Sequence, residues 1–372
     1  MSLPLSPAAA TQAVVWGGLA IGVALGALAQ ATRFCTMGAL ADWVAYGGTA
    51  RLLMWVLAVA VAALGAMGLI DAGWLDATRT VPWSDRFLWL SYLVGGAVFG
   101  VGMVLASGCP QRNLVKAGSG SLKAWVTLLV AAVSAQMTLR GVLAEPRVRG
   151  LDALGVQLSH PQDLGSMLSA VMGAPAGALR WAVLIAGLVL AAVLLWRARR
   201  EMEPSHWIGG AGIGLLVVAA WALTGHLGFI AEHPDTLEAT WSGTYSHRPE
   251  ALTFTAPVAH SLDLLTLWSD RNTGASFGVM VTLGVLLGSA LSAGLRKEFH
   301  VESFRSADDM GHHLLGGVLM GFGGVTAMGC SIGQGISGLS LLSAGACLAV
   351  VGIVGGAVLA LRVQVWRIER NA

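Results

Sequence analysis

The dominant pattern along the chain is a series of apolar stretches about as long as a membrane is thick. A helix needs roughly 20 predominantly apolar residues to cross a bilayer. Stretches of that kind predict about nine membrane-spanning helices, at 13–31, 51–70, 88–106, 121–138, 179–197, 207–230, 274–295, 311–329 and 342–362.

Three shorter apolar stretches, 36–46, 110–118 and 331–340, each follow a cysteine directly. They are too short to span a membrane and too apolar for exposed loops. Such segments are tolerated at membrane depth only where they line a cavity in the protein, since their backbone polar groups need partners. We therefore predict short re-entrant half-helices at these positions.

Composition places the chain among polytopic membrane proteins. It is 55% hydrophobic and only 11% charged, with a mean hydropathy of +0.71, which excludes an ordinary soluble domain. The net charge of +2 does not indicate a nucleic-acid partner. Fifty glycines favour close packing of helices in a bilayer. The predicted fold class is an all-α polytopic membrane protein.

The distribution of Lys and Arg predicts the orientation of the chain. Fourteen of the 22 Lys and Arg residues fall in the loops after odd-numbered spans or in the C-terminal tail. Because basic residues concentrate on the cytoplasmic side, we expect the N-terminus outside and the C-terminus in the cytoplasm of a bacterial cytoplasmic membrane. The long loops, roughly 139–178 and 231–273, are then external, and the first apolar stretch is a retained span.

An internal repeat stands out within this pattern. Residues 95–109 read GGAVFGVGMVLASGC and residues 316–330 read GGVLMGFGGVTAMGC. These are the third and eighth predicted spans, which run in opposite directions, so the match indicates inverted repeats. We expect one transport domain over 1–372, with repeat 1 at about 13–138, repeat 2 at about 274–362, and intervening helices and loops at about 139–273.

A second, weaker match disagrees with this assignment. Residues 22–31, GVALGALAQA, resemble residues 284–293, GVLLGSALSA. These lie in the first and seventh predicted spans, which run the same way. The two matches therefore imply different relative directions for the repeats.

Candidate chemistry gathers at the breaks between long and short helices. Cys35, Cys109 and Cys330 each stand at such a break, and Gly108 and Gly329 precede two of them. The start of a helix offers free backbone N–H groups and a positive dipole end, which attract anions. Thiols can add weak S–H donors or react as thiolates.

Neutral polar side chains follow these thiols. They are Gln111, Asn113, Ser331 and Gln334. Together with helix starts that approach from opposite faces, they predict a small anion site near the middle of the membrane. The competing interpretation is that each Gly-Cys pair only packs helices.

A metal or cofactor site is a weaker interpretation of the same cysteines. A zinc or iron–sulfur site needs three or four ligands in one place, and three separated thiols are a thin set. We expect no metal and no cofactor. Cys347 lies inside an apolar run, where a free cysteine behaves as a small hydrophobe, and we interpret it as a packing residue.

At these breaks the chain resembles the YeeE/YedE family of sulfur-transport membrane proteins, over about residues 15–362. Three segments carry the resemblance: Arg33-Phe34-Cys35 through Ala39-Leu40, Gly108-Cys109-Pro110-Gln111 with Leu114-Val115-Lys116, and Gly329-Cys330-Ser331-Ile332-Gly333-Gln334-Gly335. The resemblance implies thiosulfate import along a path lined by Cys35, Cys109 and Cys330. It also implies a separate soluble sulfur-carrier protein as a partner on the cytoplasmic side.

The favoured function is uptake of thiosulfate or a related small sulfur-containing anion, without enzymatic activity. Two alternatives stay open at this point. A membrane sulfurtransferase or oxidoreductase would pass sulfane sulfur between the cysteines, and a structural subunit would carry incidental thiols. The chain shows no nucleotide-binding motif and no obvious relay of buried acidic residues.

Overall fold

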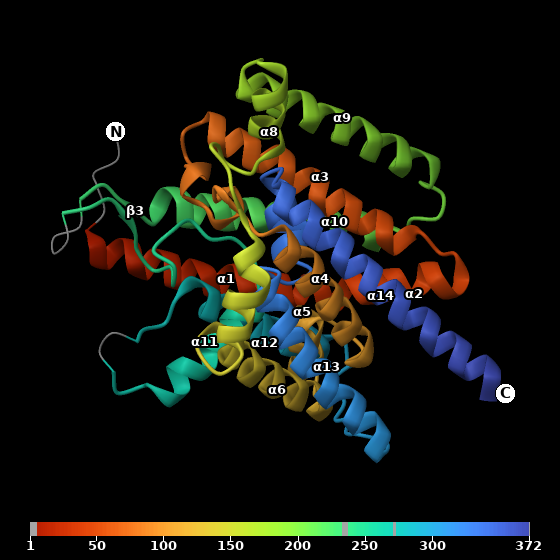
Figure 1. Ribbon diagram of the computed structural model, residues 1–372. Helices are drawn as coiled ribbons and strands as arrows, with labels where there is room; N and C mark the ends of the chain where they lie inside the picture. Colours follow the sequence, from red (N-terminus) through yellow and green to blue (C-terminus); the bar gives the residue numbers. More distant parts are fainter. Residues whose placement is uncertain (1–5, 233–236, 271–272, 372) are drawn as a thin grey trace.

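The computed structural model describes residues 6–232, 237–270 and 273–371 and is almost entirely helical (Figure 1). Within these residues, eight helices are long and apolar enough to cross a membrane. They are α1 (Pro7–Thr32), α3 (Ala50–Asp71), α4 (Trp89–Leu105), α6 (Leu122–Leu139), α9 (Ala176–Arg197), α10 (Pro204–Ala222), α12 (Phe277–Leu295) and α14 (Ala344–Asn371). The all-α polytopic fold class is confirmed.

The eighth predicted span, 311–329, forms a long helix that is less apolar than the others. This helix, α13 (Ala307–Thr326), has the length of a span but is not among the eight. Its first two turns carry Asp308, Asp309, His312 and His313, which lower its mean hydropathy. It nevertheless packs inside the bundle, against α4 and α6.

The three predicted half-helices are present. They are α2 (Thr36–Tyr46), α5 (Pro110–Gly118) and the π-helical segment η6 (Gly333–Gly338). The remaining helices are α7 (Ala144–Pro146), α8 (Leu164–Met172) and α11 (Thr255–Thr266), with short turns at η1 (Ala77–Arg79), η2 (Val81–Trp83), η3 (Arg147–Leu151), η4 (Asp152–Leu154) and η5 (Leu223–Leu227). Two antiparallel ribbons pair β1 (Arg86–Phe87) with β2 (Val156–Gln157) and β3 (Phe229–Ile230) with β4 (Thr240–Trp241).

The two Gly-Cys helices, α4 and α13, pack directly against each other through glycines. The contact pairs are Gly95 with Ala327, Gly102 with Met320 and Gly316 with Ala106, where a Cβ added to the glycine would lie 2.5, 2.8 and 2.7 Å from the partner's backbone nitrogen. Residue numbers rise along one helix as they fall along the other. The two helices therefore run in opposite directions, as an inverted repeat requires.

The weaker match has a different origin, because α1 and α12 run in the same direction. The pairs are Gly18 with Phe277, Gly22 with Val281 and Gly26 with Val285, where an added Cβ would lie 3.0, 2.4 and 2.3 Å from the partner's carbonyl oxygen. The matched segments are thus the two sides of one glycine-rich interface. A shared packing requirement explains their similarity without relating them by the repeat.

Helices α10 and α3 form a second interface of this parallel kind. Backbone meets backbone at Gly210 with Met54 and at Gly214 with Ala58, where an added Cβ would lie 2.6 and 2.7 Å from the partner's carbonyl oxygen. Helix α10 also crosses α1 in the opposite direction, with Gly17 against Leu223 and Gly212 against Leu28. Helix α10 therefore packs on α3 as α1 packs on α12. The two pairs point in opposite directions, because α10 runs opposite to α1.

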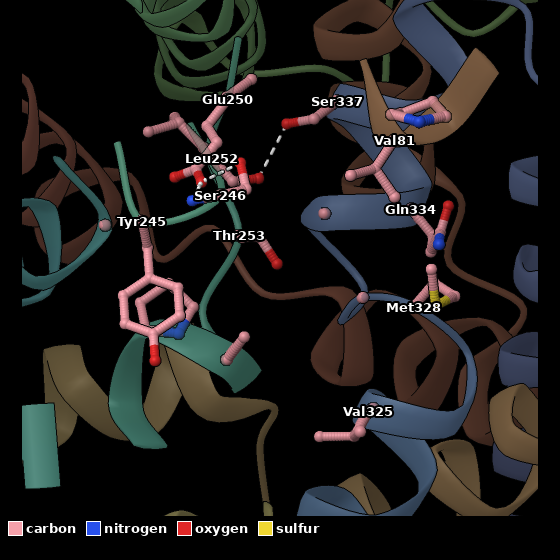
Figure 2. Close-up of a pocket in the computed structure, with 18 of the residues that line it drawn as sticks. Val81, Tyr245, Ser246, Glu250, Leu252, Thr253, Val325, Met328, Gln334 and Ser337 are labelled. Atoms are coloured by element: carbon pink, nitrogen blue, oxygen red, sulfur yellow. Dashed lines mark hydrogen bonds between the residues drawn. The ribbon is translucent and has the colours of Figure 1, made fainter. Parts of the chain in front are cut away.

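The periphery differs from this packed centre. Helices α8 and α9 lie at one side of the bundle, and α9 is mostly exposed (Figure 1). The segment Ser246–Thr253, which leads into α11, faces the region of Met328, Gln334 and Ser337 across a cavity (Figure 2). That region includes the break after α13, so the cavity lies beside Cys330, one of the three candidate site cysteines.

Candidate functional site

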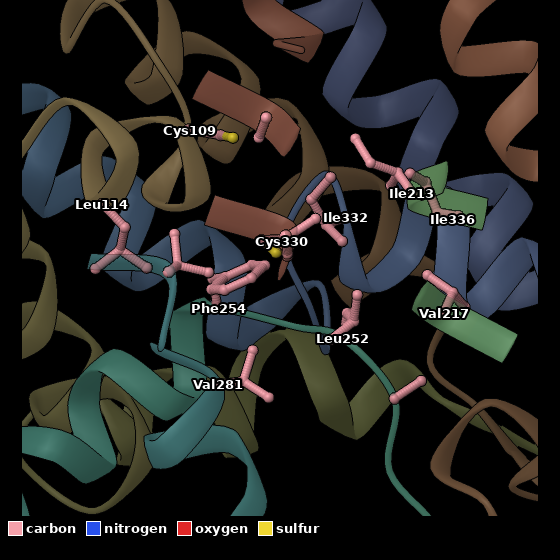
Figure 3. Packing of buried hydrophobic residues seen from close by; sticks show 14 of the residues in the cluster. Cys109, Leu114, Ile213, Val217, Leu252, Phe254, Val281, Cys330, Ile332 and Ile336 are labelled. Carbon is pink, nitrogen blue, oxygen red and sulfur yellow. The ribbon is translucent and has the colours of Figure 1, made fainter. Parts of the chain in front are cut away.

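The three cysteines of the breaks come together in the centre of the molecule. Cys109 and Cys330 are fully buried and Cys35 is 8% exposed. The Cys109 thiol lies close enough to those of Cys35 and Cys330 to interact electrostatically with both. Figure 3 shows Cys109 and Cys330 in the same buried cluster of apolar side chains. All three thiols are free.

Two of the sulfurs occupy the same local geometry. Cys35 is the N-cap of α2, and its Sγ accepts a hydrogen bond from the Gly38 N–H at 3.3 Å. Cys330 Sγ accepts one from the Gly333 N–H at 3.4 Å, also three residues ahead. A side chain that accepts from the third residue of a helical turn replaces the usual Ser or Asp cap. Because the sulfur accepts in this bond, the bond itself leaves the S–H hydrogen of each thiol free to donate elsewhere.

Residues that follow these thiols in the sequence carry polar atoms without partners. Within the described residues, Thr36 Oγ1, Gln111 Nε2, Gln111 Oε1 and Ser331 Oγ are buried and have no hydrogen-bond partner. The Ser331 hydroxyl lies near the Cys109 thiol without making a hydrogen bond of acceptable geometry. Buried polar groups are normally paired, because an unpaired one costs about 1–3 kcal/mol. A polar ligand at this position would give them partners.

The other two predicted polar residues brace the breaks. Asn113 Nδ2 donates to the Gly108 carbonyl at 2.8 Å and to the Cys109 carbonyl at 3.2 Å. Gln334 Nε2 donates to the Ala327 carbonyl at 2.7 Å. Both amides therefore donate to backbone carbonyls at the breaks, and the Ala327 carbonyl stands at the end of α13, where helical partners run out.

The glycines before two of the thiols have little room for a side chain of their own. A Cβ on Gly329 would lie 3.1 Å from Gln334 Cγ, and one on Gly108 would lie 3.0 Å from Arg112 Cγ. The residues that precede them, Ser107 and Met328, both adopt left-handed backbone conformations, with φ of 53° and 59°. At both breaks, the residue two positions before the cysteine thus has a left-handed backbone conformation.

A cavity of about 250 Å³ opens beside Cys330, and we name it the Thr253 cavity. Its wall includes Thr253, Gly329, Gly333 and Gln334 on the Cys330 side, and Glu250 and His260 farther out. Thr253 lines this cavity (Figure 2), and its Oγ1 lies 3.9 Å from Cys330 Sγ. Burial lowers the pKa of His260 to about 4, so its ring is neutral near pH 7.

A second cavity, of about 560 Å³, lies beside α5, and we name it the Arg112 cavity. Basic side chains dominate its wall, whose charged members are Arg33, Arg112, Lys116, Lys123, Glu298 and Glu302. It lies near the thiols, because the backbone N–H of Arg112 is close to the Cys109 thiol and Lys116 lies within electrostatic range of Cys35. One cavity therefore lies near Cys330, and a second, basic cavity lies near Cys109 and Cys35.

Two residues of this arrangement were absent from the sequence-based site. Thr36 follows Cys35 directly, and its position in the first turn of a short helix was a usable signal. Thr253 lies in a loop 77 residues before Cys330 and has no motif around it.

Cys347 lies apart from the three thiols. It is half-buried in α14 and has no thiol neighbour in the part of the chain described. In those same residues, no three His, Cys, Asp or Glu side chains gather closely enough to hold a metal ion.

Comparison with known proteins agrees with this arrangement. A family model described as sulphur transport matches residues 31–359. The thiosulfate transporter TsuA of Escherichia coli K12 is 27% identical over 347 residues, covering 87% of each chain. The thiosulfate transporter TsuA of Spirochaeta thermophila is 26% identical over 355 residues, covering 92% of this chain and 97% of its own.

Proposed function

Because the chain belongs to the YeeE/YedE sulphur transport family, we propose that it takes up thiosulfate along a path through its three buried thiols. It is a multi-pass membrane transporter and not an enzyme, in keeping with relatives named as thiosulfate transporters. The observation that supports the proposed path is that the buried thiols of Cys35 and Cys330 lie within electrostatic range of Cys109, with a cavity near Cys330 and another near Cys109.

The chemistry of the path suits a sulfur-containing dianion. Removing such an anion from water is costly unless donors replace its hydration shell. The S–H groups of Cys35 and Cys330, the unpaired Gln111 amide and the unpaired Ser331 hydroxyl supply neutral donors. Conduction also requires that the anion leave each site, and weak donors allow this better than a fixed positive charge.

The distribution of charge supports the direction of the path. The Arg112 cavity and the C-terminal ends of α1 and α12 carry many basic residues, which favour the cytoplasmic side. In this orientation the N-terminus lies outside, the C-terminus lies in the cytoplasm of a bacterial inner membrane, and lipid covers the exposed apolar helix faces. The Thr253 cavity is then the outer entrance.

The helix contacts support a longer second repeat than the sequence suggested. We propose that α1 to α6 and α10 to α14 are the two inverted halves, with α9 between them. The antiparallel pair α4 and α13, and the inverted likeness of α1–α12 and α10–α3, both support this division. The thiols then lie where the two halves meet, as in other transporters built from inverted repeats.

A soluble sulfur-carrier protein on the cytoplasmic side is a proposed partner. The resemblance to the family implies such a carrier, and the Arg112 cavity opens toward the side where it would work. Pull-down of the membrane protein with the carrier of the same host would test this partnership.

Uptake of labelled thiosulfate by a host that lacks its own thiosulfate uptake tests the proposed function. Cells that express the chain should accumulate the label and grow on thiosulfate as the sulfur source. The same result from cells with an empty vector, or no accumulation despite folded protein in the membrane, would overturn the proposal.

Replacing Thr253 by valine should raise the KM for thiosulfate roughly three- to tenfold. Valine keeps the shape of threonine but removes the hydroxyl beside Cys330, and one hydrogen bond contributes about 0.5–1.5 kcal/mol. Thr253→Ser keeps the hydroxyl and should stay close to the wild-type KM. Equal KM values for the valine and serine variants would exclude a role for the hydroxyl.

Uptake should fall as the external pH rises through the pKa of Glu250. Burial raises the pKa of this carboxyl, and hydrogen bonds from Ser246 only partly oppose the shift. Below that raised pKa the side chain is neutral, whereas above it a negative charge stands in the Thr253 cavity and repels a dianion. Glu250→Gln should remove this part of the pH dependence, and Glu232→Gln, on the exposed surface, should preserve it. A Glu250→Gln variant with the wild-type pH profile would contradict this assignment.

A further inference from the structure

The Arg112 cavity holds more positive charge than its own acidic residues neutralise. Glu302 already accepts a hydrogen bond from Ser121 at 2.8 Å and pairs with Lys123 at 3.7 Å. Glu298 accepts one from Gln30 at 2.6 Å and pairs with Arg296 at 3.7 Å. Both carboxylates are therefore engaged at the rim of the cavity.

The remaining basic groups differ in how they are held. Lys116 Nζ donates to the Ser107 carbonyl at 2.6 Å. Within the described residues, the guanidinium groups of Arg33 and Arg112 make no hydrogen bond and no ion pair. Arg112 is half-buried, whereas Arg33 is exposed. Of these two arginines, Arg112 has less access to water, and its guanidinium has no protein partner among the described residues.

An unpaired, half-buried guanidinium is an unfavourable arrangement for the free protein. Arginine offers five donors in a planar fork that matches the oxygens of an oxyanion. Lys116 stands close enough to repel Arg112 electrostatically. A bound dianion would give Arg112 a partner and would reduce that repulsion. The cavity volume of about 560 Å³ has room for a small oxyanion with part of its water.

We propose that the Arg112 cavity is a binding site for a small tetrahedral oxyanion with two charges, such as thiosulfate or sulfate, with Arg112 as its main ligand. The thiosulfate case rests on the proposed transport function, in which the site receives the anion after it passes Cys109. The negative interior of a cell opposes the entry of a dianion. A basic site at the inner end of the path offsets this opposition.

Equilibrium binding to the purified full-length protein in detergent tests the proposal. The probes are ³⁵S-labelled sulfate and ³⁵S-labelled thiosulfate, measured at low salt and at about 150 mM salt, where exposed charges are screened. We expect both anions to bind the wild type. Arg112→Gln should weaken sulfate binding roughly tenfold or more, and Arg112→Lys should lie between.

Arg296→Gln is the matched control. Arg296 carries the same charge at the same end of the molecule, but it is exposed, pairs with Glu298 and does not line the cavity. This variant should bind sulfate as the wild type does. An equal loss in both variants would show a general surface potential and overturn the site. Elution of each variant as a single symmetrical peak in size-exclusion chromatography establishes that it is folded.

The two anions separate this proposal from the transport function. Thiosulfate binding that depends on Arg112, without sulfate binding, would support the site and assign it to the transported anion alone. Sulfate binding that depends on Arg112, in a protein that takes up no thiosulfate, would support the site and overturn the transport function. Binding of neither anion, or binding unchanged in Arg112→Gln, would overturn the site.

Discussion

Replacing Cys109 or Cys330 by alanine is expected to reduce thiosulfate uptake at least about tenfold while leaving folded protein in the membrane. Both thiols are fully buried at the junction of the path, so their loss removes donors that no water can replace. Alanine is smaller than cysteine and fits the same space, which limits the structural cost to that of a small cavity. Uptake of radiolabelled thiosulfate, divided by the amount of monodisperse protein, measures the effect.

Cys347→Ala is the matched control for this experiment. Cys347 is half-buried in α14, away from the three thiols, so its replacement should leave uptake near the wild-type rate. Wild-type uptake by Cys109→Ala or Cys330→Ala would contradict the path through the thiols. Loss of uptake by Cys347→Ala, at normal expression, would show that its role was assigned wrongly.

Replacing Gly95 by valine is expected to remove most of the folded protein. A Cβ at this position would lie 2.5 Å from the Ala327 nitrogen and 2.9 Å from the Gly323 oxygen, and both atoms belong to the backbone of α13 or its end. Backbone cannot turn aside as a side chain can, so α4 and α13 would have to separate. Overpacking of this kind costs roughly 1–3 kcal/mol or more. The yield of monodisperse protein and its melting temperature measure the loss.

Gly187→Val provides the comparison. Gly187 lies in α9, where an added Cβ would meet nothing within 4 Å, so this variant should keep the wild-type yield and melting temperature. Similar losses for both valine variants would mean that glycine acts here through helix propensity or membrane insertion and not through close packing. Normal stability of Gly95→Val would contradict the observed approach of α4 and α13.

The apolar pattern was sufficient to predict most of the fold. The limits of α2 and α5 agree with the stretches 36–46 and 110–118, because the Cys35 side chain caps α2 and Pro110 favours the first position of α5. The pattern was less informative for α10, whose relation to α1 has no clear repeat in the sequence. Close packing of glycines against neighbouring backbone is what α1 and α10 have in common. The other residues of the two helices are free to differ, so their sequences do not match.

Sequence was a weaker guide to the roles of individual site residues. It identified Gln111 and Ser331 as polar residues beside the thiols, and both have unpaired buried atoms. It did not distinguish them from Asn113 and Gln334, whose amides brace carbonyls at the breaks. That difference depends on side-chain direction within the first turn of a short helix. The approach of Thr253 to Cys330 depends on tertiary folding alone, so no local pattern predicts it.

Transport of intact thiosulfate by purified protein in liposomes tests the central claim most directly. Two preparations of thiosulfate, one labelled at the terminal sulfur and one at the central sulfur, are supplied outside the liposomes. A transporter moves the whole anion, so both labels should accumulate inside in equal amounts, and Cys109→Ala should abolish both. Entry of only one label, or entry that is unchanged in Cys109→Ala, would contradict passage of the intact anion through the three thiols.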